Sequence, residues 1–336
     1  MKEAGAGDQG AFAQLTEPHR RELNVHCYRM LGSIEDAEDA VQETFLRAWA
    51  RLDSFAGRAS FRAWLYGIAT NACLDMLRRR RHPARLWPTD VAGPAEVGSV
   101  SAPTTEVAWL QPYPDRLLAV PAPAEAEPEV AVAAKETIEL AFLAAIQRLP
   151  ARQRAVLILR DVLDWSAKDT ATTLEMTTAA VNSALQRAHA GLAAHVPPDR
   201  DEWLAQHRVT AAATDKALLH RLVEAWERTD TTALVTLLRD DARLVMPPRL
   251  TWFAGSAAIE RFFRTHVFDA RARGWRLVPT SANRQPAFAL YQRAEDVAEF
   301  LPFGIGVLTI DRGAISELAL FADPSLFDRF GMPKTL

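Results

Sequence analysis

Four consecutive arginines, Arg78 to Arg81, form the clearest chemical signal in this chain. Adjacent guanidinium groups cover most of a helical turn, so several must face solvent or a polyanion, and phosphate is the natural partner. The aromatic residues Phe61, Trp64 and Tyr66 precede them. Flat rings beside cations suit unstacked bases held against a phosphate backbone. Complementing a helix dipole is the alternative role for the arginine run, and it stays open at this point.

One amphipathic helix is expected to carry both groups. Over Ser60–His82 the apolar residues recur every three or four positions without a proline, and Ser60 is the expected N-cap. Two helices are expected before it. The first runs roughly from Phe12 to Leu31 and ends at Gly32, and the second is capped by Ser33 and has acidic residues in its first turn. Three helices with short connections predict a compact all-α unit.

The second of these helices has one apolar and one polar face. Its apolar positions are Ala37, Val41, Phe45, Ala48 and Leu52. The opposite positions are Asp36, Asp39, Gln42, Glu43 and Arg47. Since a surface helix must be polar on one side, a solvated face is the ordinary interpretation, and a partner-binding face is the alternative.

Length and composition limit the class of protein. With 336 residues, two or three domains are expected, and 49% hydrophobic with 24% charged residues is typical of globular chains. A net charge of −3 argues against a protein that coats nucleic acid over its whole surface, so any polyanion site is a local patch. Cys27 and Cys73 lack the spacing of a metal site or a disulfide framework. We expect a soluble, cytoplasmic protein without metal, cofactor or membrane association.

A linker is expected after the arginine run. The stretch Pro83–Pro128 holds nine of the twenty prolines, together with alanines and acidic residues. Within it, WLQPYPDRLL (Trp109–Leu118) is unusually apolar for a tether. Because exposed Trp, Leu and Tyr are costly in water, we favour a peptide that docks on a neighbouring domain over a chance cluster.

The stretch Lys135–Ala194 returns to helical periodicity, broken at Pro150. Its end indicates two short helices separated by a tight turn through Glu175, the second capped by Thr177. The outward positions of this last helix are Thr178, Ala179, Asn182, Ser183, Gln186 and Arg187. The pattern predicts a helix-turn-helix whose second helix enters a DNA major groove, with an ordinary helical hairpin as the alternative.

The chain changes character from about Thr214. Helices give way to a strand around Arg243–Met246, followed by a helix over Ser256–Val267. Further strands are predicted near Trp275–Ala282, Pro286–Arg293, Gly304–Asp311 and Ala314–Phe321. Helices followed by consecutive strands predict an α+β domain with an antiparallel sheet.

These motifs together resemble a known family. DAEDAVQETFLRAW and FRAWLYGIATNACLDMLRRRR are similar to region two of sigma-70 initiation factors of the extracytoplasmic-function type, and LPARQRAVLILRDVLDWS with AAVNSALQRAHAGL to region four. LLRDDARLVMPP, WFAGSAAIERFF and LALFADPSLFDRFGMP resemble a SnoaL-like domain, a cone of curved sheet and helices. The resemblance implies a region-two bundle (8–82), a linker (83–133), a region-four helix-turn-helix (134–196) and a SnoaL-like domain (210–336).

The resemblance also implies roles for residues. The β′ clamp helices of core RNA polymerase would be bound by the polar stripe, which consists of Asp36, Asp39, Gln42, Glu43 and Arg47. The β subunit of the polymerase is a further expected partner. The minus-ten element would meet Phe55, Arg62, Trp64, Asn71, Arg78, Arg79, Arg80 and Arg81, with Asn71 and Phe55 holding a flipped base and the arginines gripping phosphates. The minus-thirty-five element would meet the six outward positions of the last helix. Glu175 departs from the family, which usually has glycine in that turn.

The resemblance therefore implies an alternative sigma factor rather than an enzyme, with a C-terminal domain that regulates the sigma part in cis. Asp240, Asp241, His266 and Asp323 lack a catalytic spacing; we expect Asp240–Asp241 to end a helix and Asp323–Pro324 to begin a turn. Six apolar side chains are candidates for lining a small-molecule pocket, with an ordinary hydrophobic core as the alternative: Trp226, Met246, Trp252, Phe263, Trp275 and Phe303. A helix-turn-helix repressor and a small-molecule enzyme with a vestigial helical half remain the alternatives.

Overall fold

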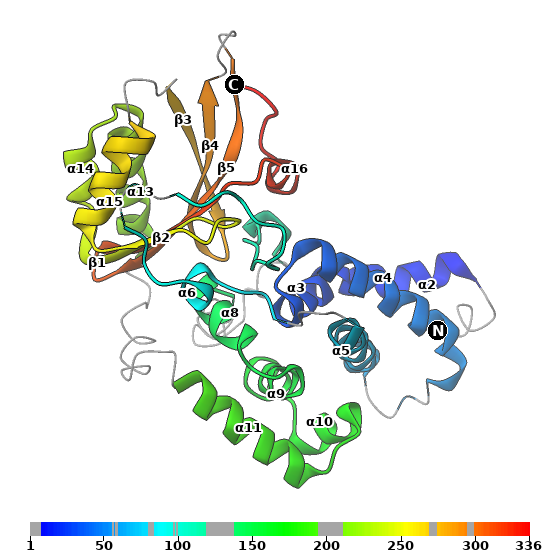
Figure 1. Cartoon of the computed structure of the whole chain (residues 1–336). Coiled ribbons are helices and arrows are strands. Elements are labelled where there is room, and N and C mark those ends of the chain that lie inside the picture. The colour runs from blue at the N-terminus through cyan, green and yellow to red at the C-terminus, as the bar shows by residue number, and fades with distance from the viewer. Residues whose placement is uncertain are drawn as a thin grey trace. The chain divides into compact units, whose positions relative to one another are not determined.

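A computed structural model of the chain describes residues 8–55, 57, 60–79, 84–96, 98, 100–118, 138–193, 211–268, 274–293 and 299–336. The predictions for Arg80 and Arg81 lie outside these residues. The described chain forms two compact units (Figure 1). The first unit combines the residues up to Arg85 with those from Leu117 to Ala193, and the second combines Leu86–Arg116 with the residues from Ala211 onward.

The first unit begins with a bundle of helices. They are α2 (Gln9–Thr16), a 3₁₀ turn (Glu17–His19), α3 (Arg20–Leu31), α4 (Ile34–Ala50), a 3₁₀ turn (Leu52–Ser54) and α5 (Phe61–Arg79). The single helix predicted over Phe12–Leu31 is wrong, because Pro18 lacks the N–H that would continue the ladder, and the 3₁₀ turn replaces it. Gly32 ends α3 in the left-handed region at φ 68°, and Ser33 Oγ accepts a 3.3 Å hydrogen bond from Asp36 N.

The same unit contains the predicted helix-turn-helix. Its helices are α8 (Leu140–Gln147), α9 (Ala151–Leu157, continued as a π-helix over Ile158–Val162), α10 (Ala167–Leu174) and α11 (Thr178–Ala193). Glu175 adopts the left-handed conformation at φ 53°, so the turn forms although glycine is missing. Thr177 Oγ1 accepts a 3.1 Å hydrogen bond from Ala180 N, which confirms the predicted cap.

The second unit is a sheet with helices. Its helices are α6 (Pro88–Val91), α13 (Ala211–Glu227), α14 (Thr231–Val235), α15 (Ser256–Phe262, continued as a π-helix over Phe263–Val267) and α16 (Leu326–Phe330). A 3₁₀ turn (Asp115–Leu117) lies at the boundary between the two units in the sequence. Its strands are β1 (Leu238–Val245), β2 (Trp252–Ala254), β3 (Trp275–Ala282), β4 (Gln285–Arg293), β5 (Phe300–Asp311) and β6 (Ala314–Phe321). They lie in the order β2-β1-β6-β5-β4-β3. The α+β class is confirmed.

Two details of the predicted sheet are wrong. Strands β1 and β6 pair in parallel, so the sheet is mixed rather than antiparallel. Asp240 and Asp241 lie within β1 rather than at the end of a helix, because Ala242 and Leu244 bury alternate positions of this segment against the core. By contrast, Asp323 begins a turn as predicted, accepting a 2.9 Å hydrogen bond from Ser325 N.

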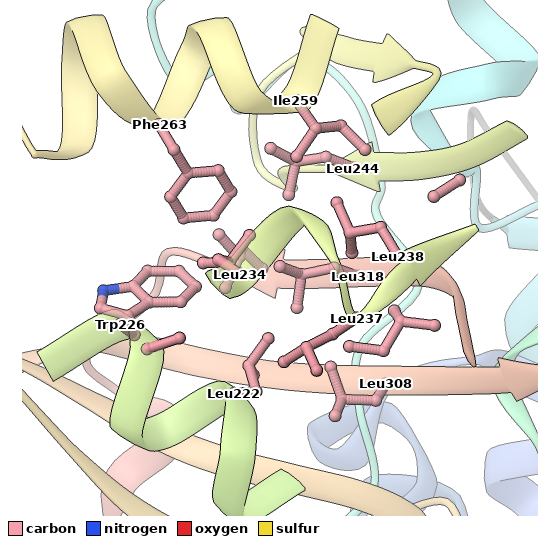
Figure 2. Close-up of a cluster of buried hydrophobic side chains, with 14 of the residues drawn as sticks. Leu222, Trp226, Leu234, Leu237, Leu238, Leu244, Ile259, Phe263, Leu308 and Leu318 are labelled. Atoms are coloured by element: carbon pink, nitrogen blue, oxygen red, sulfur yellow. The ribbon is translucent and has the colours of Figure 1, made fainter. Parts of the chain in front are cut away.

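Helices cover one face of this sheet with an apolar core (Figure 2). Trp226 from α13 is 1% exposed and contacts the rings of Phe263 and Phe288 at centroid distances of 4.8 and 5.6 Å. Gly306 of β5 allows the Phe288 ring to cross this strand, because a Cβ there would lie 2.2 Å from the ring. Burial of these aromatic side chains stabilises the unit by about 1.5–3 kcal/mol each.

The opposite face of the sheet is covered by other segments. Residues alternate between faces along a strand, so Glu317 and Phe321 of β6 point away from the buried Leu318 and Leu320. Phe321 contacts the ring of Trp87 at 5.8 Å, from the segment that precedes α6. The stretch Leu86–Arg116 thus belongs to the fold of the second unit.

We call Leu86–Arg116 the strap. Trp252 Nε1 donates a 2.8 Å hydrogen bond to the carbonyl of Ala92, and Ser101 N donates one of 2.7 Å to Thr251 Oγ1. Tyr113 N donates to Asn283 Oδ1, and Asn283 N to the Tyr113 carbonyl, both at 2.8 Å. Trp109, Leu110 and Tyr113 are buried. The predicted docking of the apolar peptide is confirmed, and its surface is the sheet domain.

Candidate protein and nucleic-acid interfaces

The predicted polar stripe lies on the outer side of α4, but its members differ in availability. Asp39 and Gln42 are exposed. Asp36 forms an ion pair with Arg85. Glu43 Oε1 accepts a 2.7 Å hydrogen bond from Arg47 Nε, and Arg47 Nη1 donates one of 2.7 Å to Asp75 Oδ2. The stripe is therefore fixed to α5 through Arg47.

The carboxyl of Asp75 is the centre of this network. Burial alone would raise the pKa of Asp75, but the hydrogen bond and charge of Arg47, followed by the charges of Arg78 and Arg79, lower it below the ordinary value. Arg78 also forms an ion pair with Asp75. Asp75 thus stays ionised at neutral pH and is paired both with Arg47 of α4 and with Arg78, the first arginine of the run, on its own helix.

An aromatic cluster lies at the other end of α5. Phe55 contacts Phe61 and Trp64 at centroid distances of 5.7 and 5.1 Å, and Phe61 contacts Trp64 at 5.5 Å. All three rings are only half-buried, so their outer faces are open to solvent. This is the arrangement that stacking with a base requires.

Arg62 is held by the chain itself. Its Nε donates a 2.8 Å hydrogen bond to Glu22 Oε2, and its guanidinium lies 4.8 Å above the ring of Tyr66. Burial, followed by the charge of Glu22, raises the pKa of Tyr66, whose hydroxyl donates a 3.2 Å hydrogen bond to the same carboxylate. The Arg62 side chain remains half exposed and could meet a phosphate only by sharing or leaving Glu22.

Asn71 is engaged with the helix-turn-helix. Its Nδ2 donates a 3.3 Å hydrogen bond to the carbonyl of Thr173 in α10. One turn earlier on α5, a Cβ on Gly67 would lie 3.4 Å from Thr173 Cγ2. Trp64, Gly67, Asn71 and Arg78 share one face of α5 because they are three, four and seven residues apart. The described conformation therefore places α10 on the face predicted to hold the flipped base.

A buried arginine connects the same two groups of helices, and the sequence reading did not single it out. Arg154 of α9 is 1% exposed. Its guanidinium donates to the carbonyls of Ile146 and Gln147 at 3.0 and 2.7 Å, and also to the carbonyl of Met30 in α3. Burial lowers the pKa of Arg154 to about 10, so it is charged at neutral pH.

The outer face of α11 makes a continuous polar surface. All six predicted residues, Thr178, Ala179, Asn182, Ser183, Gln186 and Arg187, are exposed. Val181, Ala184, Ala188 and Leu192 are buried on the opposite side. The helix thus presents amide, hydroxyl and guanidinium groups of the kinds that read base edges in a major groove.

The residues predicted to line a pocket are mostly core. Trp226, Met246, Phe263 and Trp275 belong to the buried cluster, and Phe303 packs against it. Trp252 is separate, since its indole is bound to the strap. The other candidates for chemistry in this unit lie on the surface: Asp240, Asp241 and His266 are exposed.

The sequence matches known family models in both helical parts. Residues 15–82 match Sigma-70 region 2, and residues 139–190 match Sigma-70, region 4. The first match contains α4 and α5, and the second contains α10 and nearly all of α11. We call these two matched parts the conserved regions.

Individual relatives define the family of this chain more closely. The chain is 42% identical over 331 residues to the ECF RNA polymerase sigma factor SigG of Mycobacterium tuberculosis, covering 98% of this chain and 85% of SigG. It is also 35% identical over 188 residues to SigM of the same species, covering 56% of this chain and 78% of SigM. The chain belongs to the ECF RNA polymerase sigma factors.

A solved structure extends the likeness to the complete fold. The crystal structure of the extracytoplasmic function sigma factor SigJ of Mycobacterium tuberculosis matches with a TM-score of 0.60 at 22% identity, over 96% of this chain and 99% of that chain. The likeness includes the C-terminal α+β domain. Among the described residues, no helix is both long and apolar enough to span a bilayer.

Proposed function

We propose that this alternative sigma factor binds core RNA polymerase through α4 and opens promoter DNA with α5. The observation that carries the proposal is the composition of one α5 face, where the aromatic cluster, the amide of Asn71 and the arginines from Arg78 follow one another. Rings and an amide capture an unstacked base, and the arginines hold its phosphates, which together offset the few kcal/mol of unpairing.

The two other contacts follow from the remaining surfaces. The exposed Asp39 and Gln42, with Glu43 beside them, would bind the β′ clamp helices, and the polymerase β subunit would lie nearby. The outer face of α11 would read the minus-thirty-five element. Support comes from exposure of that face, since a recognition helix must be free to enter the groove.

The C-terminal domain would regulate the sigma part in cis. Support comes from the strap, which lies between the two conserved regions in sequence and is bound to the sheet domain by hydrogen bonds and buried aromatic side chains. A domain that binds the segment connecting two DNA-binding parts can shift the equilibrium between different separations of those parts. A small-molecule ligand that alters this equilibrium remains a prediction from the sequence.

Run-off transcription with purified core polymerase tests the proposal. Asn71→Ala should reduce open-complex yield while leaving affinity for the core unchanged. Gln186→Ala should weaken promoter discrimination by about 1–3 kcal/mol through loss of a base contact. Gln42→Ala with Glu43→Ala should weaken core binding. Unchanged core affinity in that double variant would contradict the proposed docking surface.

A further inference from the structure

The polar face of α4 contains an apolar side chain that the fold does not use. Leu46 is 66% exposed. Among the described residues only three other large apolar side chains are exposed, Val91, Leu301 and Leu336, and these reach 41–44%. By contrast, the buried apolar residues of the same helix are Ile34, Ala37, Ala40, Val41 and Ala48. A leucine with two thirds of its surface in water indicates a surface that is covered when a partner binds.

Leu46 continues the stripe proposed to meet the polymerase. The exposed positions Glu35, Asp39, Gln42 and Leu46 are separated by four, three and four residues, so they follow one face of the helix. This face is acidic at its N-terminal half and apolar after Gln42, where Ala50 is also exposed. A partner that covers this whole face must therefore offer cationic groups to the acidic half and an apolar surface to the other half.

The residues on either side of Leu46 pack α4 into the helical bundle. Trp49 packs edge-on against Phe12 at a centroid distance of 5.0 Å, and the guanidinium of Arg20 lies 4.8 Å above the ring of Phe45. These contacts fix α4 on both sides of Leu46. Because these contacts already order the backbone of α4, little backbone freedom is lost when this face binds a partner.

The charge of the stripe selects the kind of partner. Glu35, Asp39 and Glu43 would repel phosphates, so nucleic acid does not fit this face. We propose that Leu46 inserts into an apolar pocket of the core polymerase, adjacent to the cationic groups that meet the acidic half of the stripe. This inference rests on the proposed docking of α4 and adds an apolar anchor to it, as in other complexes where a helix lies in a groove.

The test measures affinity of full-length variants for purified core RNA polymerase. Leu46→Ala should weaken binding about tenfold, because the burial of an aliphatic side chain is lost. Leu46→Asp should weaken binding further, because a carboxylate is costly to bury in an apolar pocket. Leu46→Met should retain most of the affinity, because it keeps an apolar side chain of similar volume. Leu336→Ala, the same change at another exposed leucine, is the matched control and should bind like the unchanged protein.

Further measurements separate the outcomes. Thermal unfolding of Leu46→Ala should match the unchanged protein, and at saturating polymerase its run-off yield should recover. If Gln42→Ala weakens core binding but Leu46→Ala does not, the anchor is wrong and the docking surface stands. If neither change weakens binding, the proposed function itself fails. If Leu46→Ala instead abolishes self-association seen by sedimentation, the occupant is a second copy and the proposal is overturned.

Discussion

The side-chain amide of Asn71 donates its hydrogen bond to the backbone carbonyl of Thr173, 102 residues further along the chain. The residue proposed to hold a flipped promoter base is therefore occupied by the helix-turn-helix. A base can replace the Thr173 carbonyl only if α10 leaves α5. In the described conformation, α10 therefore covers this part of α5.

Locking this contact should block promoter opening. In a Gly67→Cys/Thr173→Cys variant the two new side chains would lie close enough for a disulfide, since a Cβ at Gly67 comes within 3.4 Å of Thr173 Cγ2. The oxidised variant should form no open complex, and a reductant should restore it. Permanganate reactivity of minus-ten thymines measures this, with Gly67→Cys alone as control. Equal opening before and after reduction would show that the contact is not inhibitory.

Arg154 should be essential for stability of the helical unit. Arg154→Ala leaves the carbonyls of Ile146, Gln147 and Met30 buried without their donor, so the free energy of unfolding should fall by about 3–5 kcal/mol. Arg152→Ala, the same change at an exposed position of α9, should alter it by less than about 0.5 kcal/mol. Chemical denaturation compares the two, and similar losses would refute a special role for Arg154.

Stability of the sheet domain should depend on the ionisation of Glu317. Burial raises the pKa of Glu317, against the opposing effects of Arg243, whose Nε lies 3.0 Å from the carboxylate, and of the Trp87 indole. Because the folded protein binds this proton more tightly, its contribution is full below the ordinary carboxyl pKa of about 4.3 and is lost as pH rises through the raised value.

Glu317→Gln should therefore stabilise the protein near neutral pH. The remaining Arg243 is half exposed, so no buried charge is left alone, and a gain of about 1 kcal/mol is expected. The gain should shrink as the pH is lowered towards 4.5. Thermal unfolding at several pH values measures it, with the exposed Glu299→Gln as control. A gain independent of pH would contradict the assignment.

Attachment of the strap should depend on Asn283. This residue has φ 55°, which asparagine tolerates better than alanine, and it makes two 2.8 Å hydrogen bonds with the backbone of Tyr113. Asn283→Ala should loosen the strap and speed tryptic cleavage after Arg116, whose side chain otherwise binds the carbonyls of Asp328 and Arg329. It should also change transcription from a target promoter if the domain regulates in cis. Unchanged cleavage would show that the strap is held elsewhere.

Much of the fold follows from local patterns. Ser33, Ser60 and Thr177 accept hydrogen bonds at helix N-termini as expected, because capping depends only on the next three residues. The register of β1 could not be obtained this way. Asp240 and Asp241 look like the polar end of a helix, and only pairing with β6, more than 70 residues later, makes the segment a strand.

The residues of the candidate sites also differ in whether local sequence patterns predict them. The outer face of α11 and the polar stripe of α4 follow from helical periodicity. Burial of Arg154 and occupation of Asn71 depend on contacts between regions separated by more than 100 residues, for which the sequence has no local signal. Leu46 differs, because helical periodicity alone places it on the polar face, four residues after Gln42.

The strap can attach to the sheet domain only late in synthesis. Its partners at Thr251, Asn283 and Asp328 lie 150, 170 and 212 residues further along the chain, beyond all of the helix-turn-helix. At about 5–20 residues per second a ribosome exposes both conserved regions many seconds before the sheet exists. A nascent or prematurely ended chain therefore carries both conserved regions while Trp109 and Tyr113, which are buried in the complete fold, have no sheet to cover them.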